Sequence, residues 1–171
     1  MEIQKYRLFT RAALLLALTV LFQSLRLIIP LPPLFSTFLI GSLVNACLLI
    51  ATETAGLKAA LAIAIATPIV AWFQQLLPLP VLILPVAIGN VIYVTVYSTI
   101  YSNHRWTGLF AAAGAKTLFL YAAFDWLLGF IALPAKVSAG ILFVMSWPQF
   151  ITAILGGIIA AYVSKRVKQS L

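Results

Sequence analysis

The sequence contains six apolar stretches, each long enough to cross a lipid bilayer, and short turns with proline, glycine or charged residues separate them. A bilayer core about 30 Å thick needs about 20 helical residues per crossing. Hydrophobic residues make up 64% of the chain and charged residues only 8%, whereas soluble domains contain about a quarter charged residues. We therefore expect this chain to fold with the lipid bilayer as its solvent.

The pattern predicts an all-α integral membrane protein, a six-transmembrane-helix bundle that forms one domain over residues 1–171. Membrane-spanning strands would alternate apolar and polar residues, but these stretches are continuously apolar. The expected helices cover residues 8–29, 34–52, 57–76, 80–102, 107–131 and 138–164.

The placement of the positive charges predicts the orientation. Eight of the 11 Lys and Arg residues fall at the termini or in turns that six crossings would bring to one face, and such an excess marks the cytoplasmic side. Both termini are therefore predicted to be cytoplasmic, in a multi-pass protein of the cell membrane. Because the charges are not interleaved with stacking aromatic residues on a soluble surface, the net charge of +8 does not indicate nucleic-acid binding.

The residue inventory argues against catalysis and against a metal site. Cys47 and His104 are the only residues of their kinds, and the chain has three acidic residues in all. Metal sites and acid–base catalysis need several such groups at one depth. We predict no enzyme activity, no cofactor and no metal.

Lys116 is the most informative single residue, because it lies about nine positions inside the fifth stretch, roughly 13 Å from the expected cytoplasmic end. A lysine at that depth costs about 2.5–3.5 kcal/mol even on the scale derived from translocon insertion. It is expected to face a wet cavity, an anion or a polar partner. The structural alternative is a lysine bonded to helix-end carbonyls or to Asn45 and Asn90.

Other polar residues at similar depth are further candidates for a binding site. Asn90 and Tyr93 are three residues apart on one face of the fourth stretch. Trp147 and Gln149 lie at comparable depth in the sixth, but they point about 200° apart, so one of them is expected to pack internally.

An arginine near the external face and a proline near mid-membrane carry further signals. Arg26 could form an interfacial ion pair with Asp125. Pro148, expected near mid-membrane inside the sixth helix, would remove a backbone donor and indicate a kink beside a cavity.

Small residues at four-residue spacing mark close helix contacts. Ala13 and Ala17 form such a stripe on the first helix, and Ala153, Gly157 and Ala161 form another on the sixth. Small side chains let two helices approach closely in a membrane. Each stripe fits either internal packing or a partner protein.

Taken together, the chain resembles a family of small six-helix membrane proteins, the substrate-binding S components of energy-coupling-factor (ECF) vitamin transporters. The resemblance spans nearly the whole sequence. The motifs that carry it are Ala13-xxx-Ala17, Ile40-Gly-Ser-Leu-Val-Asn45, Ile88-Gly-Asn90, Ala115-Lys-Thr-Leu-Phe-Leu-Tyr121 and Trp147-Pro-Gln-Phe-Ile-Thr-Ala-Ile-Leu-Gly-Gly157.

The resemblance implies partners and a site. Ala13 and Ala17 would dock on a transmembrane coupling protein to which two ATPases bind. A pocket near the external side, capped by residues 30–34, would hold a small vitamin-like molecule. As a hypothesis, the substrate-binding residues are those already singled out by depth: Asn90, Tyr93, Lys116, Trp147 and Gln149.

In that hypothesis Lys116 meets a negative group of the ligand, such as a carboxylate, and the aromatic residues meet its ring. The main alternative is a non-transport scaffold subunit of the cell-shape machinery, because MreD-like rod-shape subunits have a similar size and number of crossings.

Overall fold

The computed structural model describes residues 2–29 and 32–169, and its regular secondary structure there is entirely helical. The elements in chain order are α1 (Glu2–Ile28), α2 (Pro33–Thr54), α3 (Leu57–Phe73), the short 3-10 helix η1 (Pro80–Leu82), α4 (Ile83–Ile100), α5 (Arg105–Leu128), α6 (Ala135–Val144) and α7 (Trp147–Gln169). Residues 30 and 31, part of the segment expected to cap a pocket, lie outside the described residues.

The expectation of an all-helical fold is confirmed for the described residues. Five segments of the described chain are long and apolar enough to cross a membrane: Tyr6–Ile28, Leu34–Thr54, Pro80–Ile100, Arg105–Leu128 and Ala135–Val167. The remaining expected crossing, over residues 57–76, corresponds to α3. This helix has 17 residues and ends at Phe73 instead of residue 76. At 1.5 Å per residue α3 is about 26 Å long, near the lower limit for spanning a bilayer core.

The expected continuous helix over residues 138–164 is wrong. The chain there forms two helices, α6 and α7, which meet at Met145 and Ser146. Pro148 therefore lies in the first turn of α7 and not in mid-helix, a position where proline is tolerated because the first helical amides have no intrahelical partner. Residues in the last expected turn of the fifth helix, beyond Leu128, are likewise not helical.

Helix α2 is the central element of the bundle and contacts α1, α3, α4 and α7. Its closest approach is to α7, where Gly156 lies against the α2 backbone: a Cβ atom at Gly156 would lie 2.6 Å from Asn45 Cβ and 2.7 Å from the Ser42 carbonyl oxygen. Only glycine allows the two helices to pack this closely. This contact fixes the position of Asn45 relative to α7.

The two small-residue stripes have different environments. Ala153 is fully buried in the core, and Gly157 packs against Leu109 of α5, so this part of the α7 stripe is an internal contact. Ala13 and Ala17, in contrast, lie on an exposed face of α1 between exposed Phe9 and Leu21. The α1 stripe is therefore accessible in the isolated chain.

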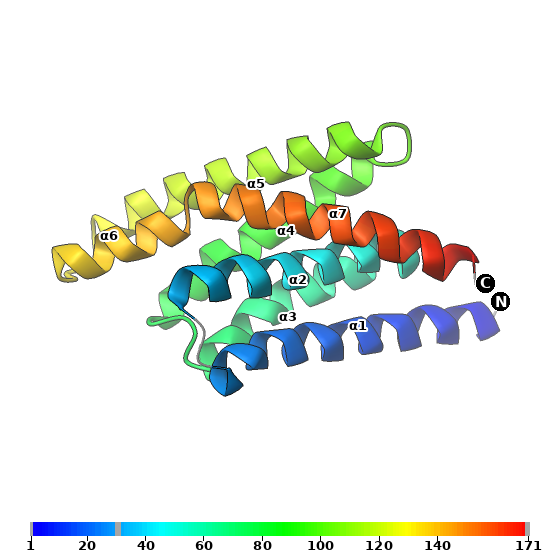
Figure 1. Ribbon diagram of the computed structural model, residues 1–171, viewed down its shortest axis with the longest axis horizontal. Helices are drawn as coiled ribbons and strands as arrows, with labels where there is room; N and C mark the ends of the chain where they lie inside the picture. The colour runs from blue at the N-terminus through cyan, green and yellow to red at the C-terminus, as the bar shows by residue number, and fades with distance from the viewer. Residues whose placement is uncertain (1, 30–31, 170–171) are drawn as a thin grey trace.

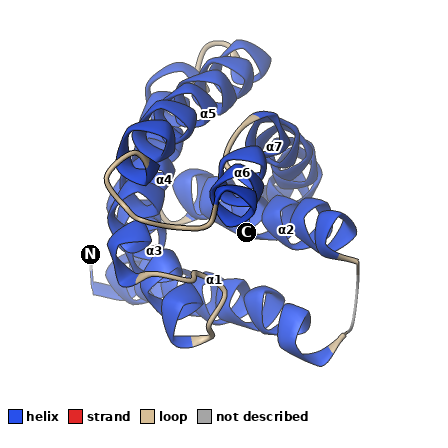
Figure 2. Ribbon diagram, turned by 90° about the vertical axis from the view of Figure 1, so that its left-hand side faces the viewer, coloured by secondary structure: helices blue, strands red, loops and turns tan. Residues whose placement is uncertain are grey.

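One end of the bundle carries both chain ends, because α1 begins and α7 ends there (Figure 1). At the same end an ion pair joins Arg105, the first residue of α5, to Glu53 in the last turn of α2. The buried Glu53 carboxylate also accepts a hydrogen bond of 2.7 Å from the Tyr97 hydroxyl. The opposite end carries α6, which lies in front of the middle of the bundle when the molecule is viewed along its length (Figure 2).

Candidate functional site

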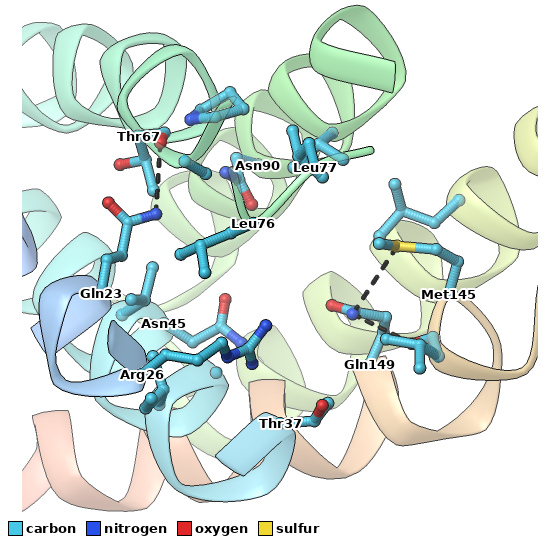
Figure 3. A pocket seen from close by; sticks show the side chains of 18 of the residues that line it. Gln23, Arg26, Thr37, Asn45, Thr67, Leu76, Leu77, Asn90, Met145 and Gln149 are labelled. Carbon is cyan, nitrogen blue, oxygen red and sulfur yellow. Dashed lines mark hydrogen bonds between the residues drawn. The ribbon is translucent and has the colours of Figure 1, made fainter. Parts of the chain in front are cut away.

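A cavity of about 190 Å³ lies inside the bundle, toward the end that carries α6. Every α-helix contributes at least one lining residue, and most of the lining is apolar. The polar lining residues are Gln23, Arg26, Thr37, Asn45, Thr67, Asn90, Lys116 and Gln149, most of which are labelled in Figure 3. The cavity is therefore a mostly apolar chamber into which a few polar and charged side chains reach.

Lys116 lies on α5, and its side chain is only 3% exposed. Its ammonium Nζ donates a hydrogen bond of 2.7 Å to Asn45 Oδ1 on α2 and lies 5.1 Å from the centroid of the Tyr93 ring. An ammonium has three N–H donors, so one hydrogen bond and one cation–π contact leave donor capacity for a ligand. Lys116 thus has a polar partner, as the structural alternative expected, and also lines a cavity.

Asn45 connects Lys116 to α7. Its Nδ2 donates to Thr152 Oγ1 at 3.3 Å, and the Thr152 hydroxyl in turn donates to the Gln149 carbonyl at 3.0 Å. The close α2–α7 packing at Gly156 brings these groups within hydrogen-bonding distance. A buried charge is tolerated only when its partners are themselves bonded, and this chain of hydrogen bonds meets that condition.

Asn90 of α4 lines the cavity and bonds to α3 beside a proline. Pro68 of α3 has no N–H, so the Ala64 carbonyl one turn earlier loses its intrahelical donor. Asn90 Nδ2 donates to that carbonyl at 3.4 Å. Its Oδ1 has no hydrogen bond to the described residues and points into the space between the helices (Figure 3).

Gln149 also bonds to a carbonyl without a helical donor, at the junction of α6 and α7. Val144 is the last residue of α6, so its carbonyl has no intrahelical N–H, and Gln149 Nε2 donates to that oxygen at 3.1 Å. The same nitrogen lies 3.8 Å from Met145 Sδ, while the amide oxygen faces the cavity (Figure 3). Asn90 and Gln149 therefore each use the amide nitrogen to satisfy a carbonyl that lacks a helical donor, and each presents its amide oxygen to the cavity.

Two of the five candidate residues do not line this cavity. Tyr93 is fully buried, and its hydroxyl donates to the Ala153 carbonyl at 2.7 Å, so its ring lies behind Lys116. Trp147 is 49% exposed and packs against Phe38 and Phe143. The expectation that Trp147 and Gln149 point in different directions agrees with this arrangement, because Gln149 alone of the two lines the cavity.

Sequence reasoning did not assign Gln23 and Arg26 of α1 to the site. The expected Arg26–Asp125 ion pair is wrong: Arg26 Nε donates to Ser36 Oγ at 3.0 Å, and Asp125 is exposed with no ion pair among the described residues. A usable signal was present, because Gln23 and Arg26 are one turn apart in an otherwise apolar helix and must share a face. Gln23 is 6% exposed, and its Nε2 donates to the Thr67 carbonyl at 3.2 Å.

A second cavity of about 470 Å³ adjoins the first and lies under α6. The two cavities share the lining residues Arg26, Thr37, Leu76, Leu77, Val144 and Met145. Lys136 in the first turn of α6 lines the outer cavity only. None of the described residues that line either cavity is acidic, so the fixed charges along this route are positive.

The geometry suits binding better than catalysis. The inner cavity offers an ammonium, a guanidinium and two amide oxygens, which can orient a small polar molecule, and apolar walls that can cover its body. Neither a curated protein nor a solved structure matches the chain. A family model described as "ECF transporter, substrate-specific component" matches residues 7–167, nearly the entire sequence. The chain therefore belongs to the substrate-specific components of ECF transporters, which are multi-pass proteins of the cell membrane that serve binding and transport and are not enzymes.

Proposed function

We propose that this chain captures a small water-soluble vitamin or a related micronutrient outside the cell and delivers it inward together with a coupling protein and ATPases. The observation that carries the proposal is the chamber around Lys116, where an ammonium, a guanidinium and several amide groups gather inside an apolar bundle. Burying a lysine and several amides at membrane depth is costly, and such groups in membrane helices mark the paths of substrates. Family membership assigns the class of subunit, and the chamber supplies the place for a ligand.

Within the chamber, Lys116 meets a negative group of the ligand, and Asn90 and Gln149 accept hydrogen bonds from its N–H or O–H groups. Tyr93 acts behind them, because its ring supports the Lys116 ammonium at 5.1 Å and its hydroxyl is already bonded. Trp147 takes no part in this revised site. Apolar side chains such as Leu120 and Val86 cover the body of the ligand.

The termini face the cytoplasm in this proposal, and the mouth of the chamber faces outward. Arg7, Arg11, Lys58 and Arg105 belong to the end of the bundle that carries the chain ends, whereas the outer cavity lies under α6 at the opposite end. An excess of Lys and Arg marks cytoplasmic segments. A solute would thus enter from outside, past α6.

The coupling protein docks on α1. Ala13 and Ala17 form an exposed strip without bulky side chains, and a partner helix can approach such a strip closely. The ligand-facing residue Gln23 lies on another face of the same helix, so docking does not obstruct the chamber. The family match decides against the alternative of an MreD-like scaffold.

The test is mass spectrometry of the small molecules that the protein retains through purification in detergent, with no ligand added. We expect one compound to be enriched in the wild type and strongly depleted in Lys116→Ala. The control is Lys58→Ala, which removes an exposed lysine far from the chamber. If the wild type retains no small molecule, or both variants retain as much as the wild type, the proposed binding site is wrong.

A further inference from the structure

The positive charges along the chamber lie at three successive levels. Lys136 lines only the outer cavity, Lys116 only the inner one, and Arg26 lines both. Arg26 therefore lies where the two cavities meet, at the neck between them. Because the described lining residues include no Asp or Glu, none of them offers a carboxylate to this guanidinium.

The hydrogen bonding of Arg26 is incomplete. A guanidinium has five N–H donors, and only Nε is used, in the 3.0 Å bond to Ser36 Oγ that joins α1 to α2. The two terminal nitrogens carry the other four N–H groups and form no hydrogen bond with the described residues. Figure 3 shows the guanidinium reaching from α1 into the group of polar side chains around the inner cavity. A planar fork of free donors matches a carboxylate or another planar anion.

We propose that Arg26 is a second cation of the substrate site and makes that site selective for ligands with an anionic group. The proposal rests on the proposed function, since it takes the inner cavity as the substrate site. Lys116 and Arg26 bracket that cavity from its base and its neck. A neutral or cationic ligand of the same shape leaves the guanidinium desolvated without a counter-charge.

The same geometry predicts which ligands are excluded. A cationic ring compound would pass three positive groups and find no carboxylate on the walls to stabilise it. Like-charge contacts in a cavity of low polarity are strongly unfavourable. The neck therefore discriminates by charge, and the amide oxygens of Asn90 and Gln149 discriminate by hydrogen bonding.

The experiment uses three probes that share one ring and differ in charge: benzoate, benzamide and benzamidine. The thermal unfolding midpoint of the purified protein, measured against probe concentration, reports binding because a ligand that binds the folded state stabilises it. For the wild type we expect stabilisation by benzoate and little or none by the other two. For Arg26→Gln we expect the apparent Kd for benzoate to rise roughly ten- to one-hundred-fold, which is the effect of losing a hydrogen bond to a charged group.

Three further variants separate charge recognition from structure. Arg7→Gln makes the same change on an exposed part of α1 outside both cavities and should leave benzoate binding unchanged. Ser36→Ala removes the α1–α2 hydrogen bond but keeps the guanidinium, and should keep the preference for benzoate. Arg26→Lys retains the charge but not the planar fork of donors. Its apparent Kd for benzoate should lie between those of the wild type and Arg26→Gln.

The proposal is overturned if the wild type responds equally to the three probes, including no response to any, or if Arg26→Gln keeps the benzoate preference. Either result leaves the proposed function standing when the wild type still retains a small molecule that depends on Lys116. Failure of that retention would instead defeat the proposed function, whatever the probes show.

Discussion

The sharpest structural prediction concerns Gly156, the glycine of α7 that lies against α2. In Gly156→Ala the new Cβ would lie 2.6 Å from Asn45 Cβ, 2.7 Å from the Ser42 carbonyl oxygen and 2.8 Å from the Ala46 amide nitrogen. Because ordinary contacts begin near 3.4 Å, the two helices must separate by roughly 0.8 Å. Two of the three atoms belong to the α2 backbone and cannot rotate away.

The expected cost follows from two opposing effects. Forcing a methyl group into a packed interior costs typically about 1–3 kcal/mol. Alanine in place of glycine stabilises a helix by about 0.5–1 kcal/mol, which offsets part of that cost. We therefore expect the free energy of unfolding to fall by about 1–2 kcal/mol. Separation of the helices should also lengthen the Asn45–Thr152 hydrogen bond, already 3.3 Å, and so disturb the partner of Lys116.

The assay is thermal unfolding in detergent, followed by ligand retention. The control is Gly114→Ala on α5, where an added Cβ meets nothing within 4 Å. Its midpoint should equal or exceed that of the wild type, whereas Gly156→Ala should unfold at a lower temperature and retain less ligand. If Gly156→Ala is as stable as Gly114→Ala and binds ligand equally well, the close α2–α7 contact does not organise the site.

The remaining predictions address the site, the docking face and the Arg105–Glu53 ion pair. Lys116→Ala should weaken binding of the retained ligand about ten- to one-hundred-fold by calorimetry, since a charged hydrogen bond is lost; unchanged affinity would remove Lys116 from the site. Replacing Ala13 and Ala17 together by leucine should abolish co-purification with the coupling protein but leave ligand retention intact, because both side chains are exposed and distant from the cavity; undiminished co-purification would place docking elsewhere. Arg105→Gln should lower the free energy of unfolding by about 1–3 kcal/mol, because Glu53 is buried and loses its cationic partner; a stability equal to the wild type, in the same detergent assay, would show that the pair contributes nothing.

Much of the fold could be predicted from hydropathy, because a lipid solvent requires long apolar helices. What hydropathy could not show was the break at Met145 and Ser146. The segment Ala135–Val167 is apolar throughout, so its composition fits one long helix. The break depends on how the Val144 carbonyl is satisfied, and Gln149 supplies that partner from the following helix through its side chain.

The candidate site could be predicted only where membrane depth itself carried the signal. Lys116 was identifiable because a charge in mid-membrane demands an explanation, and Asn90 because it lies at similar depth. Tyr93 and Trp147 share that depth, but depth says nothing about which way a ring points. Arg26 could not be placed in the site from its depth, because a position near the external face fits an interfacial ion pair with Asp125, and only the packing of α1 against α2 turns it inward.

The most direct test of the central claim is transport by the assembled complex. The chain is reconstituted in liposomes with a coupling protein and two ATPases, with ATP on the side that corresponds to the cytoplasm, and uptake of the compound that the purified protein retains is followed over time. We predict accumulation that requires ATP, the coupling module and an intact Lys116. Accumulation that proceeds equally without ATP or without this chain, or no accumulation in a complex that hydrolyses ATP, would contradict the account.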